Sequence, residues 1–113
     1  MNDRDIVVVL TNMPDRASAT RLATLLVDEG HAACVNVLAG CESIYRWQGR
    51  IETTAEVPLL IKAAARAYPA LEEAIRRHHP YELPEIVSLP VGAALPGYAD
   101  WVVAQTSRES GGS

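Results

Sequence analysis

Hydrophobic and polar positions along the first forty residues predict a strand, a helix and a second strand. Residues 6–10 are a continuous apolar, β-branched run, too short for an ordinary helix and typical of a strand buried on both faces. Asp15 then predicts a helix N-cap, and apolar residues recur with helical spacing over 17–29. Residues 32–38 predict another strand, which breaks at residues 39–40 in what we interpret as a bulge.

The next stretch predicts a long hairpin. Polar and apolar residues alternate from Ser43, as a pleated strand requires, and residues 48–50 have the composition of a tight turn. The return strand covers residues 51–62. Pro58 lacks the N–H that a ladder needs, so it predicts a bulge or a position that is unpaired on one side. A hairpin this long in a small domain offers an exposed edge to another subunit.

A second helix and a last strand follow. Pro69 suits the first helical position, and Pro80 disfavours helical geometry at His79, so the helix ends there. The inner stripe of this helix is predicted to be Leu71, Ala74, Ile75 and His78. Residues 81–84 form a loop and residues 85–91 a strand.

The C-terminal region predicts a short helix over residues 96–106, with Tyr98, Trp101 and Val102 on one side. Residues 107–113 have the composition of a loose tail. The element order is β, α, β, β, α, β and a terminal helix, which predicts an α+β fold: a ferredoxin-like βαββαβ sandwich with an extra C-terminal helix. One domain, residues 1–106, precedes the tail.

Composition and charge narrow the class of protein. The 113 residues carry a net charge of −4 and contain no Phe, so the core must come mainly from Val, Leu, Ile and Ala. Scattered basic residues in an acidic chain argue against nucleic acid as a partner. The N-terminal segment fits neither a signal peptide nor a membrane span of about twenty residues, so we expect no membrane association and a cytoplasmic location. Cys34 and Cys41 lack CxxC spacing and are interpreted as reduced thiols.

Residues 78–85 hold the richest cluster of chemistry: two imidazoles, two carboxylates and a phenol. Imidazole suits copper, nickel and zinc, and Glu82 and Glu85 extend the choice to harder ions. Adjacent helical residues point about 100° apart, however, so His78 and His79 do not share an ion in the manner of an HExxH pair. From the residues alone, a partly buried His78 and a capping His79 are the favoured interpretation, and metal binding is the alternative.

The hairpin carries the second unusual group of side chains. Tyr45 and Trp47 lie on one predicted strand face beside Arg46 and Arg50. One interpretation is half of a cleft for an anionic or aromatic ligand. The other, which we favour, is a hairpin arm buried against a neighbouring subunit, because Tyr, Trp and Arg are enriched at interfaces.

Catalysis has no positive support in the sequence. The chain contains no nucleophile elbow, phosphate loop or Rossmann glycine signature. We therefore expect a protein that is not an enzyme, and an acid–base role for Glu56, Glu52 or His79 is the least favoured hypothesis.

Four segments together resemble the CutA family: residues 7–15 (VVVLTNMPD), 33–37 (ACVNV), 43–52 (SIYRWQGRIE) and 79–85 (HPYELPE). The resemblance is collinear over about residues 6–106, with Glu56 and Lys62 between the last two motifs. It implies a homotrimer in which long hairpins between the second and third strands join neighbouring sheets, similar to PII signalling proteins.

The resemblance also implies a connection with copper and other divalent cations. It carries over His78 and His79 as proposed ligands, and our own interpretation of residues 78–85 adds Glu82 or Glu85 as helpers. Some members of the family place a cysteine immediately after the first strand, where this chain has Thr11, and a hydroxyl is a poor ligand for soft Cu(I).

The leading hypothesis is thus a trimeric divalent-cation tolerance protein that binds Cu(II) or another divalent cation. The alternative is a PII-like signalling or scaffold trimer, which binds a small ligand or a partner protein in clefts between subunits. Those clefts would be lined by Tyr45, Trp47, Arg50, Glu56 and Tyr81.

Overall fold

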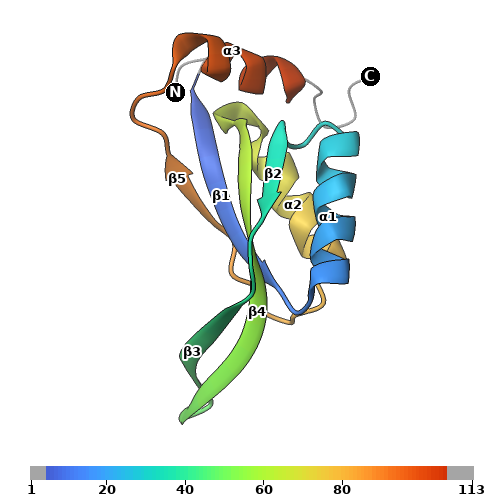
Figure 1. Cartoon of the computed structure of the whole chain (residues 1–113), viewed down its shortest axis with the longest axis vertical. Coiled ribbons are helices and arrows are strands. Elements are labelled where there is room, and N and C mark those ends of the chain that lie inside the picture. Colours follow the sequence, from blue (N-terminus) through green and yellow to red (C-terminus); the bar gives the residue numbers. More distant parts are fainter. Residues whose placement is uncertain (1–4, 107–113) are drawn as a thin grey trace.

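A computed structural model describes residues 5–106 and confirms the α+β class. The elements, shown in Figure 1, are β1 (Ile6–Met13), α1 (Arg16–Asp28), β2 (Cys34–Val37), β3 (Cys41–Trp47), β4 (Arg50–Ala64), a 3-10 turn η1 (Ala65–Ala67), α2 (Tyr68–His78), β5 (Val87–Pro90) and α3 (Pro96–Gln105). The tail predicted at residues 107–113 lies outside the described residues.

The strands form one antiparallel sheet in the order β2-β4-β1-β5, with β3 paired to the distal half of β4. β1 extends beyond the predicted apolar run, because residues 11–13 continue the ladder opposite Val57, Pro58 and Leu59. β5 is shorter than predicted and pairs with β1 only over residues 87–90. The predicted hairpin lies at residues 41–64, and Figure 1 shows it projecting beyond the body of the domain.

The predicted break between β2 and β3 is a bulge. Val37 lies opposite Leu59 and Cys41 opposite Glu56, so the three residues 38–40 face only the two residues 57–58. Pro58 still takes part in the ladder as an acceptor, because its carbonyl accepts a hydrogen bond from the Leu38 N–H at 3.0 Å. The proline therefore stands at the bulge, where its missing N–H is tolerated.

α1 and α2 cover one face of the sheet and enclose the main core. The side chains that meet there include Val9, Leu59 and Ile61 from the strands, Leu22 and Leu26 from α1, and Leu71, Ala74 and Ile75 from α2. The prediction for His78 is wrong: its side chain is exposed. The chain leaves helical geometry at His79 (φ −87°, ψ 136°), and this residue is buried in place of His78.

α3 lies across one end of the sheet, where Val102 packs with Ile6 and Ala33. Tyr98 and Trp101 do not share this burial with Val102, since they are 39% and 45% exposed and contact each other, with ring centroids 5.8 Å apart. No helix in the described part of the chain is long and apolar enough to cross a membrane.

The face of the sheet opposite α1 and α2 carries a group of partly covered apolar side chains next to Lys62 and Asn36, which lie opposite Val8 and Leu60. Val8, Leu10 and Leu60 are half-buried there. Leu89 and Val87 of β5 lie opposite Val8 and Leu10, so they point to the same face, and they are 51% and 43% exposed. We call the surface formed by Val8, Leu10, Leu60, Val87 and Leu89 the open face.

Candidate functional site

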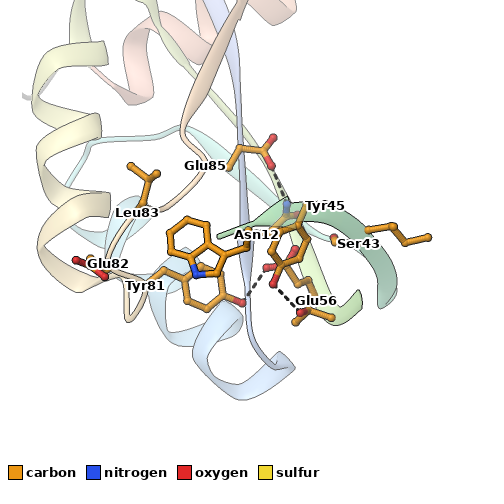
Figure 2. A pocket seen from close by; sticks show the side chains of 11 residues that line it. Asn12, Ser43, Tyr45, Glu56, Tyr81, Glu82, Leu83 and Glu85 are labelled. Atoms are coloured by element: carbon orange, nitrogen blue, oxygen red, sulfur yellow. Dashed lines mark hydrogen bonds between the residues drawn. The ribbon is translucent and has the colours of Figure 1, made fainter. Parts of the chain in front are cut away.

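A pocket of about 590 Å³ lies where the β3–β4 hairpin leaves the sheet and meets the loop after α2. Figure 2 shows the side chains that line it: Asn12, Ser43, Ile44, Tyr45, Trp47, Thr54, Glu56, Tyr81, Glu82, Leu83 and Glu85. Its volume is in the range of small-molecule sites.

The hairpin turn places one wall of the pocket. Gln48 and Gly49 both have positive φ, 52° and 81°, which is the signature of the two-residue turn that matches strand twist. This turn sets Trp47 opposite Arg50, and the same register brings Thr54 opposite Ser43. The Tyr45 hydroxyl and Thr54 Oγ1 then share a hydrogen bond of 2.8 Å.

His79 holds the loop that forms the other wall. Its Nδ1 accepts a hydrogen bond from the Tyr81 N–H at 3.2 Å, so the ring proton resides on Nε2, which donates to the Asn12 carbonyl at 2.7 Å. Burial lowers the pKa of His79, against the opposing effects of the Asn12 carbonyl and the Glu56 charge. His79 is therefore a neutral, doubly hydrogen-bonded residue.

Tyr81 and Glu56 join the loop to the base of the hairpin. The Tyr81 hydroxyl donates to Glu56 Oε2 at 2.8 Å, drawn as a dashed line in Figure 2. Burial, followed by this hydrogen bond, raises the pKa of Tyr81 well above its usual range. Glu56 is only 9% exposed, so a neutral phenol solvates one oxygen of a largely buried carboxylate.

Asn12, at the end of β1, connects both walls, and no sequence pattern singled it out. Its side-chain amide donates to Glu85 Oε1 at 3.0 Å, while its carbonyl accepts from His79. Glu85 is 73 residues away in the chain, so no local pattern marks this contact. The one signal in the sequence is the position of Asn12 within the first motif of the family resemblance.

The structure brings together most of the predicted cleft residues but not all of them. Tyr45, Trp47, Glu56 and Tyr81 line one pocket, as do Glu82 and Glu85. Arg50 does not line it: its side chain is 81% exposed and lies 3.9 Å from Glu52. The predicted anionic ligand consequently loses its basic contact, since no Lys, Arg or His is among the lining residues.

The predicted metal ligands do not form a ready-made cation site. Residues 5–106 contain no group of three or more His, Cys, Asp and Glu side chains arranged to hold an ion. Coordination by His79 would require it to give up the hydrogen bond to Tyr81 or to Asn12, whereas the exposed His78 imidazole can coordinate without such a loss. Both cysteines are free thiols, Cys34 half-buried and Cys41 exposed.

Thr11, at the position of the cysteine in some family members, does not follow the first strand but lies within β1. It is 1% exposed and does not line the pocket. In this chain the position therefore belongs to the protein interior.

Comparison with known proteins supports the same relationship along almost the whole chain. Residues 7–105 match the family described as CutA1 divalent ion tolerance protein. The divalent-cation tolerance protein CutA of Thermus thermophilus is 43% identical over 99 residues, which cover 88% of this chain and 96% of the relative. That of Pectobacterium atrosepticum is 41% identical over 107 residues, covering 92% and 97%.

Solved structures agree with the sequence matches. CutA1 from Oryza sativa superposes with a TM-score of 0.89 at 37% identity, covering 94% of this chain and 96% of that one. CutA from Xylella fastidiosa gives 0.88 at 41% identity, covering 90% and 98%. A protein from Archaeoglobus fulgidus, described as a periplasmic divalent cation tolerance protein, gives 0.86 at 25% identity, covering 89% and 98%. The chain thus belongs to the CutA1 divalent ion tolerance protein family.

Proposed function

We propose that this protein serves divalent-cation tolerance as a binding protein rather than as an enzyme. The observation that carries the proposal is the charge of the pocket: Glu56, Glu82 and Glu85 line it, and none of its lining residues is basic. Clefts of one charge sign concentrate ions of the opposite sign. Together with the relatives' names, which refer to divalent cations, this favours a cation at or near the pocket.

For the ion itself we propose Cu(II) or another divalent cation, bound by the predicted set His78, His79, Glu82 and Glu85. His78, Glu82 and Glu85 are exposed and accessible. Imidazole favours copper and zinc, and carboxylates accept harder ions as well. Because these side chains are not pre-assembled, we expect weak and exchangeable binding, with His78 as the main imidazole ligand.

Calorimetric titration of Cu(II) and Zn(II) into the purified protein tests this proposal. We expect saturable binding that weakens at least about tenfold in His78→Gln, which corresponds to about 1.4 kcal/mol. His31→Gln is the matched control, because His31 is an imidazole outside the proposed ligand set and lies 3.3 Å from Glu29. Absence of saturable binding, or equal weakening in both variants, would contradict the assignment.

We further propose a ferredoxin-like subunit that assembles into a PII-like homotrimer in the cytoplasm. The open face supports assembly, since its half-buried and exposed Val and Leu side chains are the kind of surface that a subunit contact removes from water. The projecting β3–β4 hairpin supports it as well, because Ile44 and Ile51 are 65% and 63% exposed in the single chain.

A second function is favoured by the shape of the pocket. Its volume and its aromatic wall suit a small molecule, as expected for a PII-like signalling or scaffold trimer. A ligand of the native state raises the melting temperature by mass action, so a thermal-shift screen of metabolites detects it. A screen in which only metal ions raise the melting temperature would count against this second function.

A further inference from the structure

Glu56 is a buried carboxylate whose charge no described residue balances. It is 9% exposed, and its one hydrogen-bond donor within residues 5–106 is the neutral Tyr81 hydroxyl, on Oε2. The other two pocket carboxylates have no basic partner in the described part of the chain either, and Glu85 accepts only from the Asn12 amide. A buried charge without a counter-charge is costly, so a positively charged group in the pocket would be stabilised.

Aromatic side chains line both walls of the pocket, beside these acids. Tyr45 and Trp47 from β3 and Tyr81 from the loop all line the same pocket. Figure 2 shows Tyr81 and Glu56 pointing toward each other from opposite walls, with Tyr45 beside them. Aromatic faces attract cations through their quadrupole, and the attraction grows when water is excluded.

Carboxylates and aromatic rings in one pocket favour some classes of cation over others. A hard or borderline metal ion is held tightly by several assembled donor atoms, and residues 5–106 contain no such ready-made group. An ammonium or amidinium group gains from both, because it donates hydrogen bonds to a carboxylate while its apolar body stacks on the rings. An anion would face three carboxylates.

We infer that this pocket binds a small organic cation, with its ammonium, amidinium or guanidinium group at Glu56 and its apolar body against Tyr45 and Trp47. The inference rests on the second proposed function, ligand binding in the pocket, and names its ligand class. The proposed metal site shares Glu82 and Glu85 with this pocket, whereas its main imidazole ligand, His78, does not line the pocket, so substitution of His78 separates the two proposals.

Three probes with the same ring test it: benzamidine (positive), benzamide (neutral) and benzoate (negative). The protein has two tryptophans, Trp47 in the pocket and Trp101 on α3, so their indole N–H signals in proton–nitrogen NMR spectra separate local binding from general effects. We expect benzamidine to shift the Trp47 signal saturably and leave Trp101 unchanged. Benzamide and benzoate should bind at least about tenfold more weakly.

Substitutions of the pocket carboxylates then show which negative charge binds the positive group of benzamidine. Glu56→Gln keeps an acceptor for Tyr81 but removes the charge, and should weaken benzamidine binding at least about tenfold. Glu85→Gln likewise removes a charge but keeps an acceptor for the Asn12 amide, and because Glu85 is exposed it provides the test if Glu56→Gln does not fold. Glu73→Gln is the control, because Glu73 lies on α2, 3.8 Å from Arg77, and does not line the pocket.

Equal binding of benzamide and benzamidine would overturn the inference, as would undiminished binding in both pocket variants or no shift of Trp47. His78→Gln separates this result from the metal proposal. Benzamidine binding should survive that substitution whether or not metal binding is lost.

Discussion

At the scale of single residues, the Thr11 hydroxyl is notable because it is buried without a hydrogen-bond partner in the described structure. Thr11 is 1% exposed, so its hydroxyl has lost water without a replacement. Thr11→Val keeps the branched shape and removes the unsatisfied group, and we expect the free energy of unfolding to rise by about 1 kcal/mol. Urea denaturation at fixed protein concentration measures the change.

Thr11→Ser is the matched control. It keeps the hydroxyl and removes a buried methyl group, so we expect it to lower the free energy of unfolding by about 1 kcal/mol. A Val variant that is no more stable than the original protein would show that the hydroxyl is satisfied, for example by a buried water.

His79 makes stability depend on pH. Its pKa is lowered in the folded state, mainly by burial, so the unfolded chain takes up the proton first as the pH falls. The stability that comes from keeping His79 neutral is fully present above the unfolded-state pKa of about 6.5. It is lost as the pH falls from there to the lower folded-state pKa of His79.

Unfolding measured at several values between about pH 7.5 and 5 tests this dependence. His79→Gln should flatten the slope of the free energy of unfolding over that interval, since glutamine does not titrate. His78→Gln removes the neighbouring, exposed imidazole and serves as the comparison. If the two variants have the same slope, the burial of His79 and its hydrogen bonds to Asn12 and Tyr81 do not control its protonation.

At the scale of elements, the β3–β4 turn decides how one wall of the pocket is placed. Gly49 has φ of 81°, where a residue with a Cβ is strained, although nothing within 4 Å would clash with that atom. Gly49→Ala should therefore lower the free energy of unfolding by about 1 kcal/mol through backbone strain alone.

Gly97→Ala is the counterpart for this test. Gly97 lies in the first turn of α3, has open space around an added Cβ and has no positive φ. Alanine favours the helix, so this variant should be more stable by up to about 1 kcal/mol. Thermal and urea unfolding of both variants give the comparison, and a loss at Gly97 equal to that at Gly49 would contradict the strain argument.

At the scale of the whole molecule, the open face predicts the oligomeric state. Leu60→Glu places a charge at its centre and should dissociate a trimer, whereas Val27→Glu, on the exposed side of α1, should not. Light scattering after size exclusion gives the mass, which we expect to be three times the 12.2 kDa of the chain for the original protein and for Val27→Glu. A monomeric original protein would contradict the trimer.

The sequence by itself determined the features that depend on neighbours in the chain. Asp15 caps α1, accepting from the Ser18 N–H at 2.8 Å, because side-chain capping involves residues within one turn. The Gln48–Gly49 turn and the bulge at Pro58 also follow from local backbone restrictions, so both were predictable. Family membership was predictable as well, because each of the four motifs is a short run of consecutive residues.

Only the tertiary structure decided which side chains share the pocket. His78 and His79 are adjacent in sequence, yet His78 is exposed and His79 is buried. The reason is that His79 forms a hydrogen bond with the carbonyl of Asn12, 67 positions away in the chain. The contact of Asn12 with Glu85, the exclusion of Arg50 and the burial of Thr11 have the same origin. Local patterns encode backbone geometry, whereas burial and charge partners depend on where distant segments of the sheet and loops are brought together.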